Sequence, residues 1–168
     1  AATSMELGIK DVGILLAAQT GGSLASNALW GRIGDRFGKL VLLQAVGGLR
    51  LVPPLGALVI FAIAADLAPA ATLVAFAVLF VLIGALINGM TIGYLGYLME
   101  ISPNEQRPAY SAYFNALASP AALLPLAGAA IADVISLQVV FVVAVLAAAL
   151  QLFLYARLSR WEKETDVA

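Results

Sequence analysis

The residues of this chain best suited to chemistry are charged side chains gathered in one short stretch. Residues 31–39 read GRIGDRFGK and carry Arg32, Asp35, Arg36 and Lys39 between two long apolar runs. Carboxylates and cations at this spacing can form ion pairs and charge-assisted hydrogen bonds that hold helix ends together. A charged stretch with glycines between apolar runs predicts a short loop at a membrane surface that joins two spanning helices.

A second charged stretch runs from Glu100 to Arg107 and reads EISPNEQR. Ser102, Pro103 and Glu105 have the spacing of the N-cap, first and third positions of a helix, so we expect a capping box there. A further proline follows at once, and its ring disfavours continuation of that helix. The sequence therefore predicts a short helix at the membrane surface before the next spanning segment.

One charge, Arg50, is isolated inside the apolar sequence GGLRLVPP. It follows Lys39 by 11 residues, which places it about 16 Å along a helix that rises about 1.5 Å per residue. An arginine at that depth in lipid is costly and needs a partner. It is either an anion site or the partner of a buried carboxylate, or else a structural residue. In the structural case Gln or Asn side chains, or the carbonyls that Pro53 and Pro54 leave without amide partners, would hold it.

Uncharged polar side chains recur at helical spacing in the apolar runs. In lipid, such side chains must face protein or water. They either form hydrogen bonds between helices or line a cavity for a solute, and the sequence leaves both alternatives open. The candidate cavity residues are Gln19, Ser23, Asn27, Asn88, Thr91 and Asn115.

Several classes of function lack the residues that they need. The chain has no cysteine and no histidine, which removes disulfides, thiol chemistry and nearly all zinc or copper sites. No nucleophile motif, phosphate-binding loop or metal-ligand cluster is present in the sequence. The net charge of −1 argues against a nucleic-acid partner. We therefore expect no enzymatic activity, no cofactor and no bound metal.

The composition places these residues in a membrane. Hydrophobic residues make up 62% of the chain and charged residues 11%, and a soluble core cannot absorb that excess. Segments of about 20 apolar residues can cross a bilayer as helices. We expect an all-α membrane protein with five spans, at 11–33, 39–65, 71–99, 108–132 and 136–158. Residues 1–10 are expected as an outer loop or the end of a preceding helix, and 159–168 as a cytoplasmic tail.

The basic residues predict the orientation of these spans. If the helices alternate, seven of the nine basic residues fall on one side of the membrane. Positive charge favours the cytoplasmic side, so we expect the N-terminus outside and the C-terminus in the cytoplasm of a plasma membrane, a bacterial inner membrane in particular. The seven are Arg32, Arg36, Lys39, Arg107, Arg157, Arg160 and Lys163.

Glycines and prolines predict where the helices bend or meet. Pro53 and Pro54 should kink the second span, and two further prolines, at 120 and 125, should bend or break the fourth. Gly89 and Gly93 have the spacing that lets helix backbones touch, and Gly21 and Gly22 should allow a similar approach. The last span, apolar except for two glutamines, is expected to face lipid.

The two charged stretches together resemble loops of a known family. Gly31, Asp35, Arg36, Gly38 and Lys39 fit G-x-x-x-D-R-x-G-R/K, which resembles the signature loop of the major facilitator superfamily of secondary transporters. Glu100 and Arg107 lie in E-x-x-P-x-x-x-R, which resembles the loop after the fourth helix of each six-helix half in that family. Leu40 and the pair Ile33–Gly34 depart from the usual signature pattern.

This resemblance implies a transporter that moves a small solute by alternating access. The five spans would correspond to helices two to six of one half, with the C-terminal half favoured, so the chain would be a fragment that works with a missing other half. The charged residues of the two loops would meet in a gating network. The resemblance implies a peripheral helix around Arg50, and thus a structural role for it, held by the freed carbonyls or by Gln44. The alternative is a non-transporting membrane scaffold or assembly subunit.

Overall fold

The computed structural model describes residues 9–165, and every regular element in this range is a helix, which confirms the predicted all-α fold. The expectations for residues 1–8 and 166–168 lie outside the described residues, while Ile9 and Lys10, expected outside the spans, begin the first helix. The α-helices are α1 (Ile9–Phe37), α2 (Lys39–Leu49), α3 (Val52–Ile63), α4 (Pro69–Ile101), α5 (Arg107–Ala118), α6 (Leu124–Val134) and α7 (Leu137–Thr165). Short 3₁₀ turns are η1 (Ala64–Asp66), η2 (Asn104–Gln106) and η3 (Ser119–Leu123).

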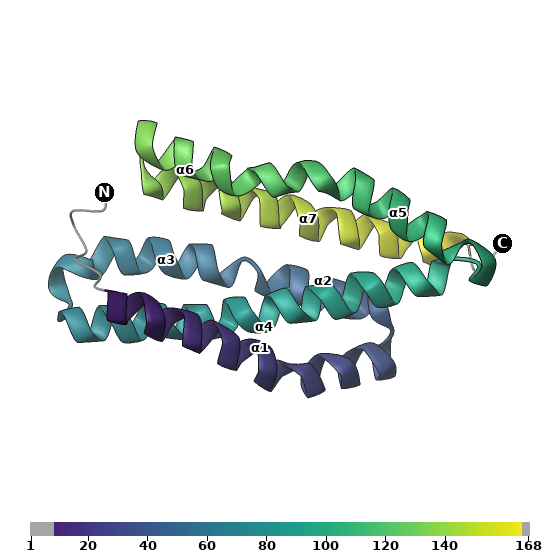
Figure 1. The fold of residues 1–168 in the computed structure, drawn as a ribbon, viewed down its shortest axis with the longest axis horizontal. Helices are drawn as coiled ribbons and strands as arrows, with labels where there is room; N and C mark the ends of the chain where they lie inside the picture. The colour runs from purple at the N-terminus through teal and green to yellow at the C-terminus, as the bar shows by residue number, and fades with distance from the viewer. Residues whose placement is uncertain (1–8, 166–168) are drawn as a thin grey trace.

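The helices run side by side along one axis, and the chain reverses direction between α1 and α2, α3 and α4, α4 and α5, and α6 and α7 (Figure 1). The turn from α1 to α2, the turn from α4 to α5 and the end of α7 lie at one end of the bundle. The α3–α4 and α6–α7 connections lie at the opposite end. The fold therefore brings the two charged stretches of the sequence to the same end of the molecule.

The helix that contains Arg50 is broken where the prolines predict a kink. α2 ends at Leu49 and α3 begins at Val52, with Pro53 in its first turn. The two prolines cannot donate to the carbonyls one turn before them, so the ladder of helical hydrogen bonds is interrupted. The amide of Leu51 instead donates to the carbonyl of Gly48 at 3.3 Å, in a tighter turn. The predicted kink is confirmed.

A second break confirms the predicted effect of the prolines at 120 and 125. α5 ends at Ala118, the 3₁₀ turn η3 follows, and α6 begins at Leu124. The three pieces still follow one line in Figure 1, along the outer side of the bundle beside α7. Each break leaves a stretch of irregular backbone part-way along a membrane-length helix, where a cavity can form between neighbours.

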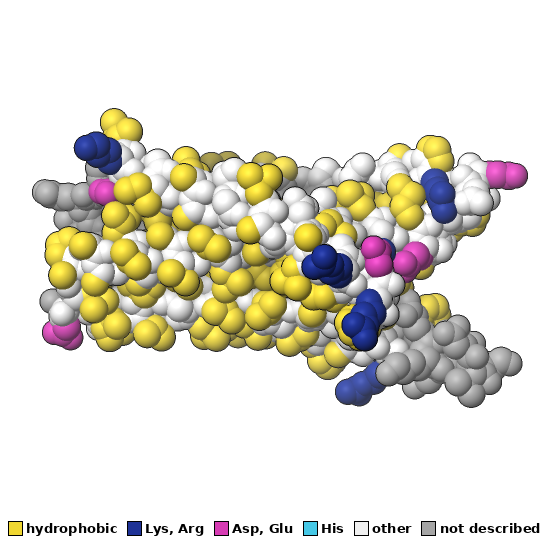
Figure 2. All heavy atoms as spheres, turned by 90° about the horizontal axis from the view of Figure 1, so that it is seen from below, with side chains coloured by type: hydrophobic (Ala, Val, Ile, Leu, Met, Phe, Trp, Pro, Cys, Tyr) yellow, Lys and Arg dark blue, Asp and Glu magenta, His cyan; other side chains and the backbone are white. Residues whose placement is uncertain are grey.

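Among the described residues, four helical segments are long enough and apolar enough to cross a membrane: Lys39–Ile63, Pro69–Ile101, Asn104–Val134 and Leu137–Trp161. α1 has 29 residues, sufficient in length, but its polar stripe makes it less apolar than these four. The face shown in Figure 2 is largely apolar over its left half and centre, and its charged side chains lie at the left end and over the right half. The predicted membrane fold is confirmed, whereas the crossing by α1 stays a prediction.

The tightest packing joins α1 and α4. Trp30, Leu42, Val46 and Leu86 form the buried core, and the indole nitrogen of Trp30 donates to the carbonyl of Ala85 at 2.7 Å. The pairing is so close that a Cβ added to Gly22 would overlap the backbone of Val81, and a Cβ added to Gly84 would overlap the backbone of Gln19. α1 and α4 thus touch backbone to backbone, as small residues allow in lipid.

Two expectations about glycines need correction. A Cβ added to Gly21 would meet no atom of another helix within 4 Å, so Gly22 alone of that pair allows the close approach. Gly89 packs against the Trp30 ring and Gly93 against the Leu43 side chain, so neither glycine lies against the backbone of another helix. The spacing of these glycines identified a packed face, but the partners are bulky side chains.

α7 closes the other side of the bundle. It packs against α2, α3 and α6. Phe61 of α3 contacts Phe76 of α4 and Phe141 of α7, with ring centroids 5.9 and 5.7 Å apart, at the end of the bundle away from the charged turns. α7 continues to Thr165, so residues 159–165 extend the last helix where the sequence led us to expect a tail.

Candidate functional site

The signature loop, residues 31–39, is almost entirely helical. Gly31, Asp35 and Arg36 lie on the last turns of α1, and Lys39 begins α2. The reversal is made at Gly38, with φ 90° and ψ 157°, and within residues 9–165 no other residue has a positive φ. This backbone conformation is essentially restricted to glycine. Gly38 therefore makes possible a one-residue connection between two helices.

The signature loop contains one ion pair. Lys39 Nζ donates to Asp35 Oδ1 at 2.7 Å, with the Lys39 side chain 17% exposed and that of Asp35 78% exposed. The alkyl chain of Lys39 lies on α4, where a Cβ added to Gly96 would come within 2.9 Å of its Cδ. Gly34 on α1 also leaves room for the Lys39 side chain, since a Cβ added to Gly34 would lie 3.1 Å from Lys39 Nζ. Lys39 thus joins the ends of α1 and α2 to α4.

The other charged residues of the predicted gating network do not meet in this structure. The Arg36 guanidinium lies 5.4 Å from the ring centroid of the adjacent Phe37. Arg107 donates from Nη2 to the carbonyl of Met99 at 3.3 Å, and Glu100 is exposed at the end of α4. Among the described residues, no ion pair links Arg36, Glu100 or Arg107 to another of the set. The two turns lie at the same end of the bundle, and the ion pair formed there, between Asp35 and Lys39, lies within the signature loop and does not join the two turns.

The predicted capping box after α4 is wrong. Ser102 is the C-cap that follows the last residue of α4, and its hydroxyl donates back to the carbonyl of Leu98 at 2.5 Å. The next helical turn, η2, begins at Asn104 without a side-chain cap. A serine hydroxyl can bond to the preceding turn of a helix as well as cap the next one, and here the first choice is taken. The short helix itself is present as a single 3₁₀ turn.

Three of the candidate cavity residues bond to one another across α1 and α4. The Asn88 amide donates to the carbonyl of Ser23 at 3.0 Å and to the side-chain oxygen of Asn27. Thr91 donates within its own helix, to the carbonyl of Ile87 at 3.0 Å. Hydrogen bonding between helices, one of the two alternatives for these polar side chains, is thus what the structure shows for Asn27 and Asn88, whereas Ser23 contributes its backbone carbonyl.

A cavity lies at the surface beside this polar contact. It has a volume of about 330 Å³ and is lined by Gln19 and Ser23 on α1 and by Gly84 and Ile87 on α4. Asn115 lies apart from it, exposed on α5. Two of the six candidate cavity residues, Gln19 and Ser23, therefore line a hollow, and Ser23 offers its backbone carbonyl to Asn88 at the same time.

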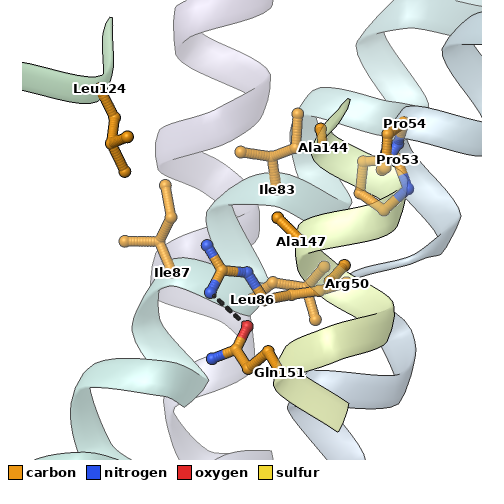
Figure 3. Close-up of a pocket in the computed structure, with 11 residues that line it drawn as sticks. Arg50, Pro53, Pro54, Ile83, Leu86, Ile87, Leu124, Ala144, Ala147 and Gln151 are labelled. Atoms are coloured by element: carbon orange, nitrogen blue, oxygen red, sulfur yellow. Dashed lines mark hydrogen bonds between the residues drawn. The ribbon is translucent and has the colours of Figure 1, made fainter. Parts of the chain in front are cut away.

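A glutamine side chain holds Arg50, which is one of the kinds of partner that the sequence suggested, but the residue is Gln151 of α7 and not Gln44. Arg50 Nη1 donates to Oε1 of Gln151 at 2.9 Å (Figure 3). Gln151 Nε2 in turn donates to the Tyr155 hydroxyl at 3.0 Å, and Gln44 donates to the Tyr155 carbonyl at 3.2 Å. The expected bonds of Arg50 to Gln44 or to freed carbonyls are not the ones formed. The four-residue spacing of Gln151 and Tyr155 was the available signal, because it puts both on one face of α7.

The Arg50–Gln151 pair borders a second cavity, of about 440 Å³, between α3, α4, α6 and α7. Of the residues that line it, only Arg50 and Gln151 carry polar side chains. Figure 3 shows the guanidinium between the Gln151 amide and the apolar side chains of Ile83 and Ile87. The sequence led us to expect that the last span faces lipid. One face of α7, with Gln151 and Tyr155, instead makes polar contacts with α2 and α4.

The comparisons with known proteins identify a family. Residues 2–167 match the family model of the Major Facilitator Superfamily. Comparison with curated proteins and with solved structures gives no match. Within the described residues there is no cluster of three or more side chains of the types that hold metal ions.

Proposed function

Because this chain belongs to the major facilitator superfamily, whose members are membrane transporters, we propose that it moves a small solute across a membrane by alternating access. The observation that carries the proposal is the placement of both charged turns at one end of the bundle (Figure 1). In a mechanism of this type, one end of the bundle closes while the other opens. Charged turns at one end can bias which end is closed.

The proposal includes a second half that completes the transport path. The five long helical units would serve as helices two to six of one half, and the solute would pass between this half and the other. The cavity bordered by Gln19 and Ser23 supports this, because it places polar groups on the paired helices α1 and α4. Asn115, exposed on α5, would face the same path from the fourth span.

We place gating at the signature loop. The Asp35–Lys39 pair and the Lys39 alkyl chain against Gly96 join the ends of α1, α2 and α4, which supports a common movement of these helix ends in the proposed mechanism. Arg36, Glu100 and Arg107 are exposed at the same end and free of ion pairs among the described residues, so they remain available to contact the other half. The excess of basic residues at this end supports a cytoplasmic location, in a bacterial inner membrane.

Transport by the full-length protein in sealed vesicles tests the proposal. We expect uptake of at least one solute from a chemically varied panel, above that of protein-free vesicles. Replacement of Gln19 by Leu should lower uptake several-fold at unchanged folded yield. The matched variant Gln138→Leu, on an exposed position of α7, should not. Absence of uptake for every solute, with folded protein in the vesicles, would favour a scaffold function instead.

A further inference from the structure

Arg50 is a charge in the middle of a membrane-length helical unit. It follows Lys39, the first residue of that unit, by 11 residues, or about 16 Å at the rise of a helix. In hydrocarbon a guanidinium needs an opposite charge or a full set of hydrogen bonds. The break between α2 and α3 at this point turns the side chain toward α7 and the cavity (Figure 3).

The described residues meet this need only in part. The bond to Gln151 uses one of the five N–H groups of the guanidinium, and Gln151 is neutral. Gln151 is itself held by Tyr155, so its oxygen is aimed at Arg50 by a neutral chain of hydrogen bonds. No carboxylate among the side chains that the structure describes pairs with Arg50. The positive charge therefore has no counter-ion in the part of the chain that the structure describes.

The cavity beside Arg50 has room for a small organic molecule. Its volume is about 440 Å³, within the usual range of ligand pockets. Pro53 and Pro54 line one side, and Leu124 and Ala147 line others, so the walls away from the Arg50–Gln151 pair are apolar. The planar fork of a guanidinium matches a carboxylate or phosphate group, which it can bind through two parallel hydrogen bonds.

We propose that this cavity binds a small organic anion, with a carboxylate or phosphate group on Arg50 and an apolar body against the proline and alanine walls. The site lies between α3, α4, α6 and α7, within this chain. It is adjacent to the cavity at Gln19, because Ile87 lines both. The proposal concerns binding and does not depend on transport. The anion comes either from solution or from a lipid headgroup, since both carry the same chemistry.

Binding to the purified full-length protein in neutral detergent tests this inference. The probe is hexanoate, and hexanamide serves as the uncharged molecule of the same shape. Ligand that binds the folded state raises the unfolding temperature with concentration, which gives an apparent Kd. We expect hexanoate to raise the unfolding temperature more than hexanamide does. The apparent Kd for hexanoate should weaken at least tenfold in Arg50→Gln and stay unchanged in Arg157→Gln, an exposed arginine near the end of α7.

A second variant covers the case in which Arg50→Gln does not fold. Ala147→Phe keeps the charge and fills the cavity, and it should also weaken hexanoate binding at least tenfold. The lipid arm replaces hexanoate by phosphatidylglycerol in the same assay. Stabilisation by this lipid that Ala147→Phe or Arg50→Gln removes would assign the site to a headgroup, and stabilisation by hexanoate alone would assign it to a solute. The inference is overturned if neither probe stabilises the protein, if hexanamide acts as strongly as hexanoate, or if both variants bind as the wild type does.

Discussion

Lys39 donates a hydrogen bond of 2.7 Å to Asp35 across the single residue Gly38, and so links two helices that run in opposite directions. Asp35 is largely exposed, so the pair by itself is worth about 0–1 kcal/mol. The Lys39 alkyl chain is mostly buried and packs on Gly96 of α4. Its packing therefore contributes more to stability than its charge does.

The first prediction compares the ion pair that is formed, Asp35–Lys39, with the pair Arg36–Glu100, which is not in contact. Asp35→Asn and Lys39→Gln should show a coupling of about 0.3–1 kcal/mol in a double-mutant cycle for unfolding, reduced at high salt. Arg36→Glu and Glu100→Arg should be additive within about 0.5 kcal/mol, because the structure shows no contact between these side chains. If the second pair were coupled in transport rate although additive in stability, it would meet in another conformation. Additivity of the first pair would contradict the geometry described here.

The second prediction concerns the backbone at Gly38. A side chain at φ 90° and ψ 157° is strained, and the cost is of the order of 1–3 kcal/mol. Gly38→Ala and Gly38→Asn should therefore destabilise the protein by similar amounts in thermal or denaturant unfolding. Asparagine tolerates the left-handed helical region but gains nothing in this extended one. Gly48→Ala is the matched control. A Cβ added at Gly48, as at Gly38, would meet no other atom within 4 Å, but Gly48 has the backbone conformation of helix α2. A clear rescue by asparagine would mean that Gly38 adopts a left-handed helical turn instead.

The third prediction compares two adjacent glycines. Gly22→Ala should destabilise by about 1–3 kcal/mol or more, because the new methyl group would overlap the α4 backbone at Val81. Gly21→Ala should be neutral or stabilise by up to about 1 kcal/mol, because the new methyl group would meet no atom of another helix within 4 Å and alanine favours helix. Folded yield and unfolding temperature of the full-length variants measure both effects. Equal effects of the two changes would show that α1 does not pack on α4 through this face.

The helices themselves follow from the sequence, because each property that defines them is local. Long apolar runs set the helical units, and prolines at 53, 54, 120 and 125 set the breaks. The family resemblance of residues 31–39 also rests on local spacing, and the match over residues 2–167 confirms it.

Contacts between distant residues could not be predicted in this way. Arg50 bonds to Gln151, 101 residues further along, because α2 packs on α7, and no local pattern specifies that packing. Likewise, the charged pattern placed Arg36, Glu100 and Arg107 at one end of the bundle but did not fix the directions of their side chains. At Ser102, two local hydrogen bonds competed, and the sequence does not say which is lower in free energy.

The last prediction tests the topology, and in particular α1, whose composition alone does not qualify it as a span. The chain has no cysteine, so single cysteines introduced into the full-length protein, if made free of other cysteines, report accessibility without background. In intact cells an impermeant thiol reagent should label Lys10→Cys and Asp66→Cys. It should label Arg36→Cys only after permeabilisation, because the excess of basic residues at that end favours the cytoplasm.

Two controls complete the set. Ser136→Cys lies at the same end as Asp66 in the fold and should behave like it, whereas Arg157→Cys should behave like Arg36→Cys. Labelling of Arg36→Cys and Arg157→Cys in intact cells, with the other positions protected, would reverse the orientation and keep the fold. Labelling of Lys10→Cys and Arg36→Cys from the same side would show that α1 does not cross. The polar stripe of α1 would then have to contact water, although Asn88 of α4 holds its Ser23 and Asn27 within the bundle.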